Sequence, residues 1–311
     1  MGGMQTRRID VNGPLNVADF GGQGPSMVLV HGLGGSHVNW MLLGPVLAER
    51  ARVLAPDMAG FGFTPPAGRG MDVHANAELL GDLLRTEIGA PAILVGNSMG
   101  ALISLMVASQ HPELVAGLVL LGPAVPVAPG VSRDRQVTLA FTAYVTPGVG
   151  EMFVRRRLAT LGPEGLVRET FSLCCVDPSR VPDEVIEKHV EMVRARTRMP
   201  WAHAAVLRAA RSLMGEILRR RRFATRLARV EAPTLVLQGE HDRLITSAAA
   251  RLAARARPGW TYRQLDGLGH TPQLEDPDRT AREILSWVDG PGRAALERAG
   301  PERGAPAVEA G

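Results

Sequence analysis

An α/β fold built on a mostly parallel, doubly wound sheet is predicted by two features of the sequence. Short apolar runs recur along the chain, and they end in Gly, Asp or Ser. Because the runs are continuous rather than alternating, they are typical of strands buried on both faces of a parallel sheet. Stretches with helical spacing of apolar residues lie between them, and this alternation predicts helices that cover the sheet.

The pattern assigns the elements to definite residue ranges. Strands are predicted over residues 27–30, 52–55, 92–95, 118–121, 234–237 and 261–265, and helices over residues 38–50, 73–88, 99–110 and 277–288. Ligands of such sheets bind at the carboxyl ends of the strands, which is where the polar residues fall here. A functional site is therefore expected at those ends.

The alternation of strands and helices stops after Pro126. The chain then reads as mostly helical as far as residue 229, with breaks at prolines, and strand signals resume at Pro233. We therefore predict a core of residues 1–126 and 230–289, interrupted by a helical insertion of residues 127–229. The tail, residues 290–311, is rich in Gly, Ala, Pro and charged residues, and we expect it to be mobile.

Composition and charge exclude several classes of protein. With 311 residues, 45% of them hydrophobic, the chain can form a substantial core. Lys188 is the only lysine, so no Gly-Lys-Ser/Thr phosphate loop is present. The net charge of +4 is small, and the arginine cluster at residues 219–222 is more typical of a solvated helix face than of a nucleic-acid-binding surface.

Cysteine usage and apolar runs bear on cofactors and location. Cys174 and Cys175 are adjacent, a spacing that rarely allows a disulfide, and no Cys-x-x-Cys or His-Glu-x-x-His metal pattern occurs. No apolar run is long enough to span a bilayer, and residues 1–11 lack the apolar core of a signal peptide. We expect a cytoplasmic monomer or homodimer with a small-molecule substrate, no metal or other cofactor, no nucleic-acid partner and no membrane span.

The strongest chemical signal is Gly-Asn-Ser-Met-Gly at residues 96–100, between a predicted strand and a predicted helix. A serine on so tight a turn is forced outward, and the flanking glycines avoid clashes, which is how a nucleophile elbow works. We therefore predict that Ser98 is a catalytic nucleophile. The alternative is a serine that only caps the helix.

A serine hydroxyl needs a general base, and that base needs an orienting carboxylate. His270 lies in a glycine-containing loop after the last predicted strand, from which its imidazole can reach across the sheet edge. Asp242 follows the strand at residues 234–237, whereas the loop after residues 118–121 contains no acid. We predict His270 as the base and Asp242 as the acid, with the rival Glu240 as a surface residue or a brace of the loop.

The oxyanion of the tetrahedral intermediate needs backbone donors. Met99 follows the nucleophile, so its N–H is the first candidate. Leu33 is the second candidate, because it lies between glycines in the loop after the strand at residues 27–30. The same loop fails as a dinucleotide-binding fingerprint, since His37 stands where the third glycine would be needed.

The chain resembles the α/β-hydrolase superfamily over about residues 5–288. His-Gly-Leu-Gly at residues 31–34 is similar to the oxyanion loop of that superfamily, and Asp-Met-Ala-Gly-Phe-Gly at residues 57–62 is similar to a loop common in its capped members. The order Ser98, Asp242, His270 is that of its catalytic triads. The resemblance implies the α/β-hydrolase fold, with a helical cap inserted between the sixth and seventh core strands.

The predicted function is that of a serine hydrolase, which cleaves a carboxylic ester or related acyl bond of a small, largely apolar substrate through an acyl-enzyme. Alternatives on the same triad are a C–C bond hydrolase of the meta-cleavage-product type and a natural-product tailoring enzyme (a cyclase, lactonase or perhydrolase). Epoxide hydrolases and haloalkane dehalogenases use an aspartate nucleophile where this chain has Ser98. A receptor or scaffold with little turnover is the third possibility.

The pocket is the least specified part of the site. We expect Met152 and Trp201 to face the triad from the insertion, and the alternative for each candidate is that it packs the core or the interface between cap and core. The low charge of the candidates favours an apolar substrate. The candidate lining residues are His31, Gly32, Trp40, Phe61, Met152 and Trp201.

Overall fold

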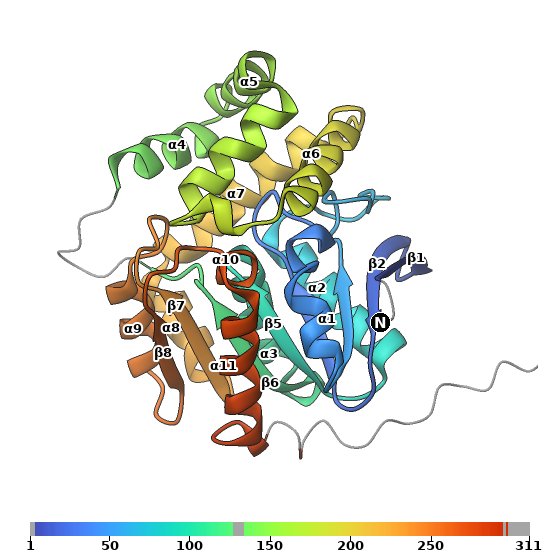
Figure 1. The fold of residues 1–311 in the computed structure, drawn as a ribbon, viewed down its shortest axis with the longest axis vertical. Coiled ribbons are helices and arrows are strands. Elements are labelled where there is room, and N and C mark those ends of the chain that lie inside the picture. The colour runs from blue at the N-terminus through green and yellow to red at the C-terminus, as the bar shows by residue number, and fades with distance from the viewer. Residues whose placement is uncertain (1–3, 127–133, 295–296, 298–311) are drawn as a thin grey trace, which may run out of the picture.

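The predicted apolar runs form the inner strands of an eight-stranded sheet. The structure is a computed structural model, which describes residues 4–126, 134–294 and 297. The strand order across the sheet is β1-β2-β4-β3-β5-β6-β7-β8 (Figure 1). The strands are Gln5–Asp10 (β1), Pro14–Gly21 (β2), Ser26–Val30 (β3), Arg52–Pro56 (β4), Ala92–Asn97 (β5), Val115–Leu121 (β6), Thr234–Gly239 (β7) and Thr261–Leu265 (β8).

Strands β3 to β8 run parallel to one another, whereas β2 pairs antiparallel with both β1 and β4. The predicted mostly parallel sheet is therefore confirmed. The sequence analysis did not identify β1 and β2. Strand β1 reads Gln-Thr-Arg-Arg-Ile-Asp and is largely exposed at the edge of the sheet, so it lacks the apolar run that marks the inner strands.

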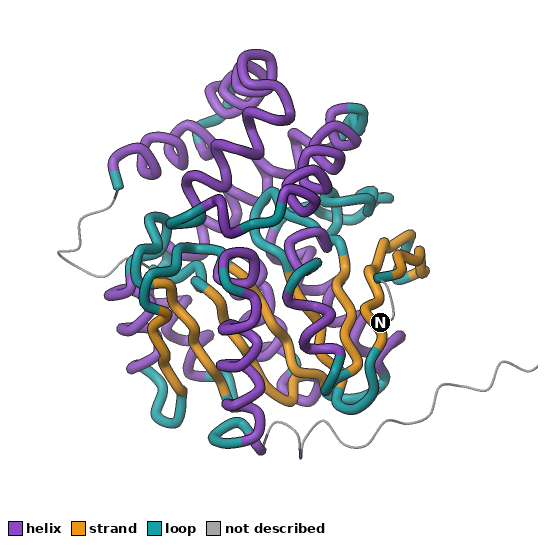
Figure 2. The backbone as a smooth tube through the Cα atoms, viewed as in Figure 1, coloured by secondary structure: helices purple, strands orange, loops and turns teal. Residues whose placement is uncertain are grey.

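Helices cover both faces of the sheet and lie above one of its edges (Figures 1 and 2). Among the described residues, no single helix is both long and apolar enough to cross a membrane; α4 and α5 meet that criterion only as a pair, bent by 116°. The helices are Leu43–Ala48 (α1), Val73–Leu83 (α2), Met99–Gln110 (α3), Arg135–Val145 (α4), Val149–Cys174 (α5), Asp183–Thr197 (α6), Ala202–Leu218 (α7), Arg220–Ala228 (α8), Ser247–Arg255 (α9), Pro272–Glu275 (α10) and Pro277–Asp289 (α11), with short turns at His37–Trp40 (η1), Leu84–Ile88 (η2), Pro112–Leu114 (η3) and Pro178–Arg180 (η4).

Successive residues of the inner strands pack on opposite faces of the sheet, as the alternation of side chains along a strand requires. In β3, Met27 and Leu29 join the apolar cluster that α1 and α11 cover. Val28 and Val30 join the second cluster, which contains residues of α2, α3 and α9. Both faces are thus buried, which explains why the runs are continuous.

Helices α4 to α8 lie between β6 and β7 in the chain, as predicted for an insertion between the sixth and seventh strands. Figure 1 shows α4 to α7 gathered above the sheet, and we call these four helices the upper helical layer. Helix α8 packs its Phe223 and Leu227 into the core cluster that contains α3, and α7 packs Ala209 and Leu213 into the same cluster. The last two helices of the predicted insertion therefore pack partly against the core of the sheet.

Several predicted boundaries agree with the structure. Helix α3 and strand β8 span the predicted residues 99–110 and 261–265. The single helix predicted over residues 38–50 is instead divided into η1, which Ser36 caps, and α1. The predicted mobile tail, residues 290–311, lies mostly outside the described residues.

Candidate active site

A sharp turn between β5 and α3 carries Ser98. Its backbone has φ 55° and ψ −113°, a conformation that a non-glycine residue adopts only where its surroundings impose it. A Cβ on Gly96 would lie 2.6 Å from the nitrogen of Ala101, and one on Gly100 would lie 2.0 Å from the carbonyl oxygen of Val30. Only glycine fits on either side of the serine, so the turn has the geometry expected of a nucleophile elbow.

The imidazole of His270 is hydrogen-bonded to the carboxylate of Asp242, with Nδ1 2.8 Å from Oδ2. Both side chains are almost completely buried, Asp242 in the loop after β7 and His270 in the loop after β8. Oδ1 of Asp242 accepts the backbone N–H groups of Leu244 and Ile245. The carboxylate is thus fixed through both oxygens, and it holds the imidazole with Nδ1 toward the acid.

Gln238, in β7, is a site residue that the sequence analysis missed. Its fully buried side chain donates from Nε2 to Oδ2 of Asp242 at 2.8 Å. The sequence signal that could have identified Gln238 is a polar residue near the end of an otherwise apolar strand. A buried amide needs hydrogen-bond partners, so such a residue is expected to contact other polar groups. Glu240, the rival acid, is exposed and accepts the N–H of Gly267, so it braces the loop as predicted.

The side chain of Asn97 connects the loop of His270 to the elbow. Its Nδ2 donates to the carbonyl oxygens of Leu121 and His270, at 3.1 Å in both cases. A Cβ on Gly122 would lie 3.0 Å from Nδ1 of His270, so the imidazole packs against the end of β6. The Ser98 hydroxyl makes no hydrogen bond within the described part of the chain; catalytic hydrogen bonds often tighten only when substrate binds.

Two backbone N–H groups near Ser98 have no acceptor within the described part of the chain. The N–H groups of Met99, at the start of α3, and Leu33, in the loop after β3, donate to no acceptor of the described residues. The loop of Leu33 lies against the elbow, since a Cβ on Gly32 would lie 3.4 Å from Cβ of Ser98. Free backbone donors beside a serine are what stabilisation of an oxyanion requires.

His31 is fully buried, and both ring nitrogens are used within the protein. Nδ1 donates to the carbonyl oxygen of Gly32 at 2.8 Å, and Nε2 accepts the N–H of Met58 at 3.0 Å. These opposite roles require the neutral ring. Burial lowers the pKa of His31 to about 4. His31 therefore braces two loops, rather than offering a free nitrogen to a substrate.

The depressed pKa of His31 predicts acid sensitivity of the fold. In the unfolded state His31 takes up a proton near its usual pKa of 6.5, whereas in the folded state it does so only at about pH 4. The buried neutral ring therefore contributes its full stabilisation of the fold above pH 6.5. This stabilisation is lost as the pH falls from 6.5 toward 4. Between pH 7.5 and 5 the loss is about 2 kcal/mol. Urea unfolding at both pH values measures it. His31→Gln should reduce this loss of stability, whereas His241→Gln, at an exposed position, should not. Equal losses in wild type and both variants would contradict the assignment of the acid sensitivity to His31.

The other pocket candidates lie in different places. The ring of buried Phe61 is 5.4 Å from that of His31. Trp40 is fully buried in the core cluster that α1 and α11 cover. This residue therefore packs the core, which was the alternative to a place in the pocket. Met152 is 64% exposed and lines a surface hollow with other residues of α5, so it lies on the outer side of that helix and the structure does not bring it to Ser98. Trp201 precedes α7, partly buried, with Nε1 unpaired among the described residues.

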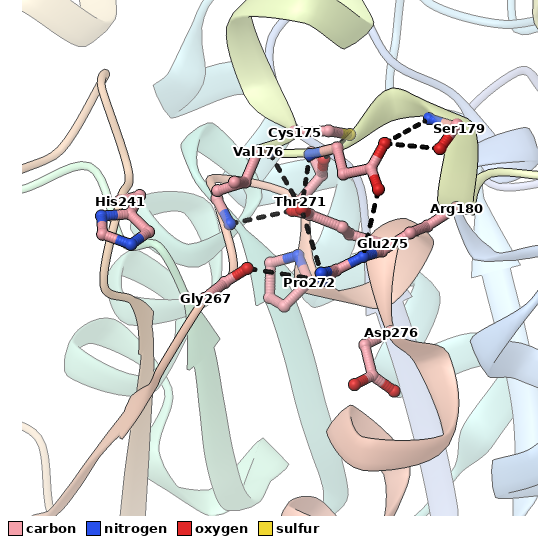
Figure 3. Close-up of polar contacts among 12 residues, drawn as sticks. Cys175, Val176, Ser179, Arg180, His241, Gly267, Thr271, Pro272, Glu275 and Asp276 are labelled. Atoms are coloured by element: carbon pink, nitrogen blue, oxygen red, sulfur yellow. Dashed lines mark hydrogen bonds and ion pairs between the residues drawn. The ribbon is translucent and has the colours of Figure 1, made fainter.

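The buried carboxylate of Glu275 connects the loop of His270 to the segment that follows α5 (Figure 3). Oε2 accepts the N–H of Gly269, and Oε1 accepts the two N–H groups of residues 176–177. The N–H of His270 itself donates to the carbonyl oxygen of Cys174 at 2.6 Å. His270, the predicted base, is therefore tied directly to the end of α5 in the upper helical layer. The sequence analysis missed Glu275, because nothing in its spacing separates a buried acid from a surface one.

Glu275→Gln is expected to destabilise the fold by about 1.5–3 kcal/mol, because its amide group would face N–H donors that now bind a carboxylate oxygen. Urea unfolding at neutral pH measures this change. Glu240→Gln is the matched control, since that carboxylate also accepts an N–H of the same loop but is exposed. Equal stabilities for the two variants would show that the buried carboxylate does not hold the loop.

The two cysteines are free thiols in the structure. Burial raises the pKa of Cys175 to about 11 and raises that of Cys174 further, so both thiols are protonated at neutral pH. The described residues contain no group of three or more His, Cys, Asp or Glu side chains arranged to hold a metal ion.

Comparison with known proteins places this geometry in a family. A sequence profile of the alpha/beta hydrolase fold matches residues 25–277, and the chain belongs to that family. It is 28% identical over 279 residues to a pimeloyl-[acyl-carrier protein] methyl ester esterase of Aromatoleum aromaticum, covering 86% of this chain and 99% of that one. It is 30% identical over 283 residues to a 2-hydroxymuconate semialdehyde hydrolase of Pseudomonas sp., covering 88% and 90%.

The fold is also similar to that of solved structures. A thermophilic esterase from Thermogutta terrifontis superposes with a TM-score of 0.69 at 25% identity, covering 93% of this chain and 99% of that one. The α/β-hydrolase fold predicted from the sequence is thus confirmed, and the chain is a member of a hydrolase family with esterase-named relatives.

Proposed function

We propose that the protein is a serine hydrolase that cleaves a carboxylic ester or related acyl bond, with Ser98, His270 and Asp242 as its triad. The observation that carries the proposal is the elbow of Ser98, next to a buried His270–Asp242 hydrogen bond of 2.8 Å. Esterase and hydrolase names among the relatives support the same reaction class.

In the proposed reaction, Nε2 of His270 accepts the proton of the Ser98 hydroxyl as its oxygen attacks the carbonyl carbon of the substrate. Asp242 keeps the proton of the imidazole on Nδ1 and stabilises the imidazolium. The N–H groups of Leu33 and Met99 bind the oxyanion, and one such donor typically contributes about 2.7–4 kcal/mol. His270 then protonates the leaving group and activates the water that releases the acid.

The upper helical layer is proposed to act as a cap over this site. The contacts of Cys174 and Glu275 with the loop of His270 support that placement, because they hold the end of α5 against the base. A cap that excludes water strengthens the electrostatic interactions beneath it. A C–C bond hydrolase is the second candidate, and the relative named 2-hydroxymuconate semialdehyde hydrolase favours it.

Hydrolysis of p-nitrophenyl esters from acetate to decanoate tests the proposal. Saturable release of p-nitrophenol by the wild-type protein is expected, and the preferred chain length measures the acyl pocket. Failure of the folded wild-type protein to hydrolyse any of these esters faster than Ser98→Ala would contradict the esterase. Cleavage of a vinylogous 1,5-diketone under the same conditions would then favour the C–C hydrolase.

A further inference from the structure

One arginine of the upper helical layer reaches the loop that holds a proposed oxyanion donor. Arg196, in the last turn of α6, donates from Nη1 to the carbonyl oxygen of Gly34 at 2.6 Å. Its guanidinium also lies over the ring of Phe61, 5.7 Å from the centroid. Gly34 directly follows Leu33, so Nη1 lies on the order of 10 Å or less from the N–H of that residue.

This guanidinium has hydrogen-bonding capacity to spare. Its Nε is buried and has no partner among the described residues, although the side chain as a whole retains some exposure. Arg194, on the same turn, is paired with Glu164, whereas Arg196 forms no ion pair with a carboxylate of the described residues. Burial lowers the pKa of Arg196 to about 10, so the side chain is still charged at neutral pH.

Asp57 is the carboxylate whose charge acts on Arg196, and its oxygens are already occupied. They accept from the backbone and ring of His37, from the side chain of Asn16 and from the N–H of Phe63. Asp57 is fully buried, and it does not form an ion pair with Arg196. The charged guanidinium of Arg196 thus has a buried Nε without an acceptor and no carboxylate partner among the described residues, which leaves donors for an anionic ligand.

We propose that Arg196 is a substrate-binding residue that pairs with a carboxylate on the acyl part of the substrate. The substrate is then a half-ester or related acyl compound whose apolar chain ends in an acid. A guanidinium suits this partner, because its planar donors match the two oxygens of a carboxylate. The inference rests on the serine-hydrolase function proposed above, and it adds one anionic group to a substrate expected to be largely apolar.

The competing explanation is that Arg196 is only a latch between α6 and the loop of Gly34. A latch would influence charged and neutral substrates equally, whereas a carboxylate partner acts on the charged one alone. The discriminating quantity is therefore the ratio of kcat/KM for mono-p-nitrophenyl adipate to kcat/KM for the same ester with its free acid replaced by a primary amide.

In wild type this ratio is expected to exceed ten, and Arg196→Gln should lower it toward one, a change of about 10- to 100-fold. Arg196→Lys should keep part of the preference because it keeps the charge. Arg194→Gln, which removes an exposed arginine of the same turn, should leave the ratio unchanged. A wild-type ratio of one or less, or the same ratio in wild type and Arg196→Gln, would overturn the proposal.

Equilibrium binding separates this proposal from the hydrolase function itself. Calorimetric titration of adipate into Ser98→Ala is expected to show binding, which should weaken at least tenfold when Arg196→Gln is added to the same chain. If wild type hydrolyses neither ester, this titration still decides the question. Adipate binding that is absent or independent of Arg196 would overturn the anion site, whatever the fate of the esterase.

Discussion

Ser98→Ala is expected to lower kcat for p-nitrophenyl ester hydrolysis by at least about 10⁴-fold, because the acyl-enzyme can no longer form. Only stabilisation of the oxyanion and substrate binding would remain. The fold should survive the substitution, since the Ser98 hydroxyl makes no hydrogen bond within the described chain. Alanine also meets no greater backbone strain at φ 55° than serine does.

Steady-state rates and the thermal midpoint of the same preparation measure this effect. A variant that is folded, with a midpoint within a few degrees of wild type, and still hydrolyses the ester within tenfold of the wild-type rate would remove Ser98 from the mechanism. The turnover would then have to come from another group of the protein or from a contaminant.

Asp242→Asn is expected to lower kcat by about 10⁴-fold, although the side chain keeps its size. In the native protein, Nδ1 of His270 donates to Oδ2 of Asp242, whereas an asparagine whose oxygen keeps the two backbone bonds of Oδ1 places an N–H donor at that position. The proton of the imidazole is then favoured on Nε2, the nitrogen that accepts the proton of Ser98 in the proposed reaction. Loss of the buried carboxylate also removes the stabilisation of the imidazolium.

Glu240→Gln is the matched control for this substitution. Glu240 lies two residues before Asp242, but it is exposed and contacts Gly267 instead of the imidazole. Its activity is expected within about threefold of wild type. Similar losses in the two variants would mean that the loop, rather than the orienting carboxylate, is what the Asp242 substitution disturbs.

The core of the fold could be predicted from the sequence because its strands are buried on both faces. Runs such as that of β5 are continuous and apolar, and they end at polar residues on the edge of the sheet where the site is proposed. Strand β1 carried no such signal, since its polar side chains are exposed. The packing of α8 on the core also lacked a clear signal, because this helix is arginine-rich and yet packs Phe223 and Leu227 into the core.

The residues predicted for the triad could be chosen because each follows a strand in a recognisable loop. Residues that act through long-range contacts could not. Glu275 and Arg196 are charged residues of helices, a type that is usually solvated, and only the tertiary structure shows that one carboxylate is buried and that one guanidinium reaches Gly34. Met152 was chosen as an apolar residue of the insertion, but sequence periodicity could not tell which side of α5 faces the core.

Covalent labelling by a fluorophosphonate tests the central claim most directly, because only an activated serine reacts rapidly with such a reagent. Intact-mass and peptide mapping of the treated wild-type protein should locate one adduct on Ser98. The labelling rate should fall by at least about 10³-fold in His270→Gln, which removes the general base. An unlabelled Ser98 in the folded protein, an adduct on another residue, or an equal labelling rate in His270→Gln would contradict the account.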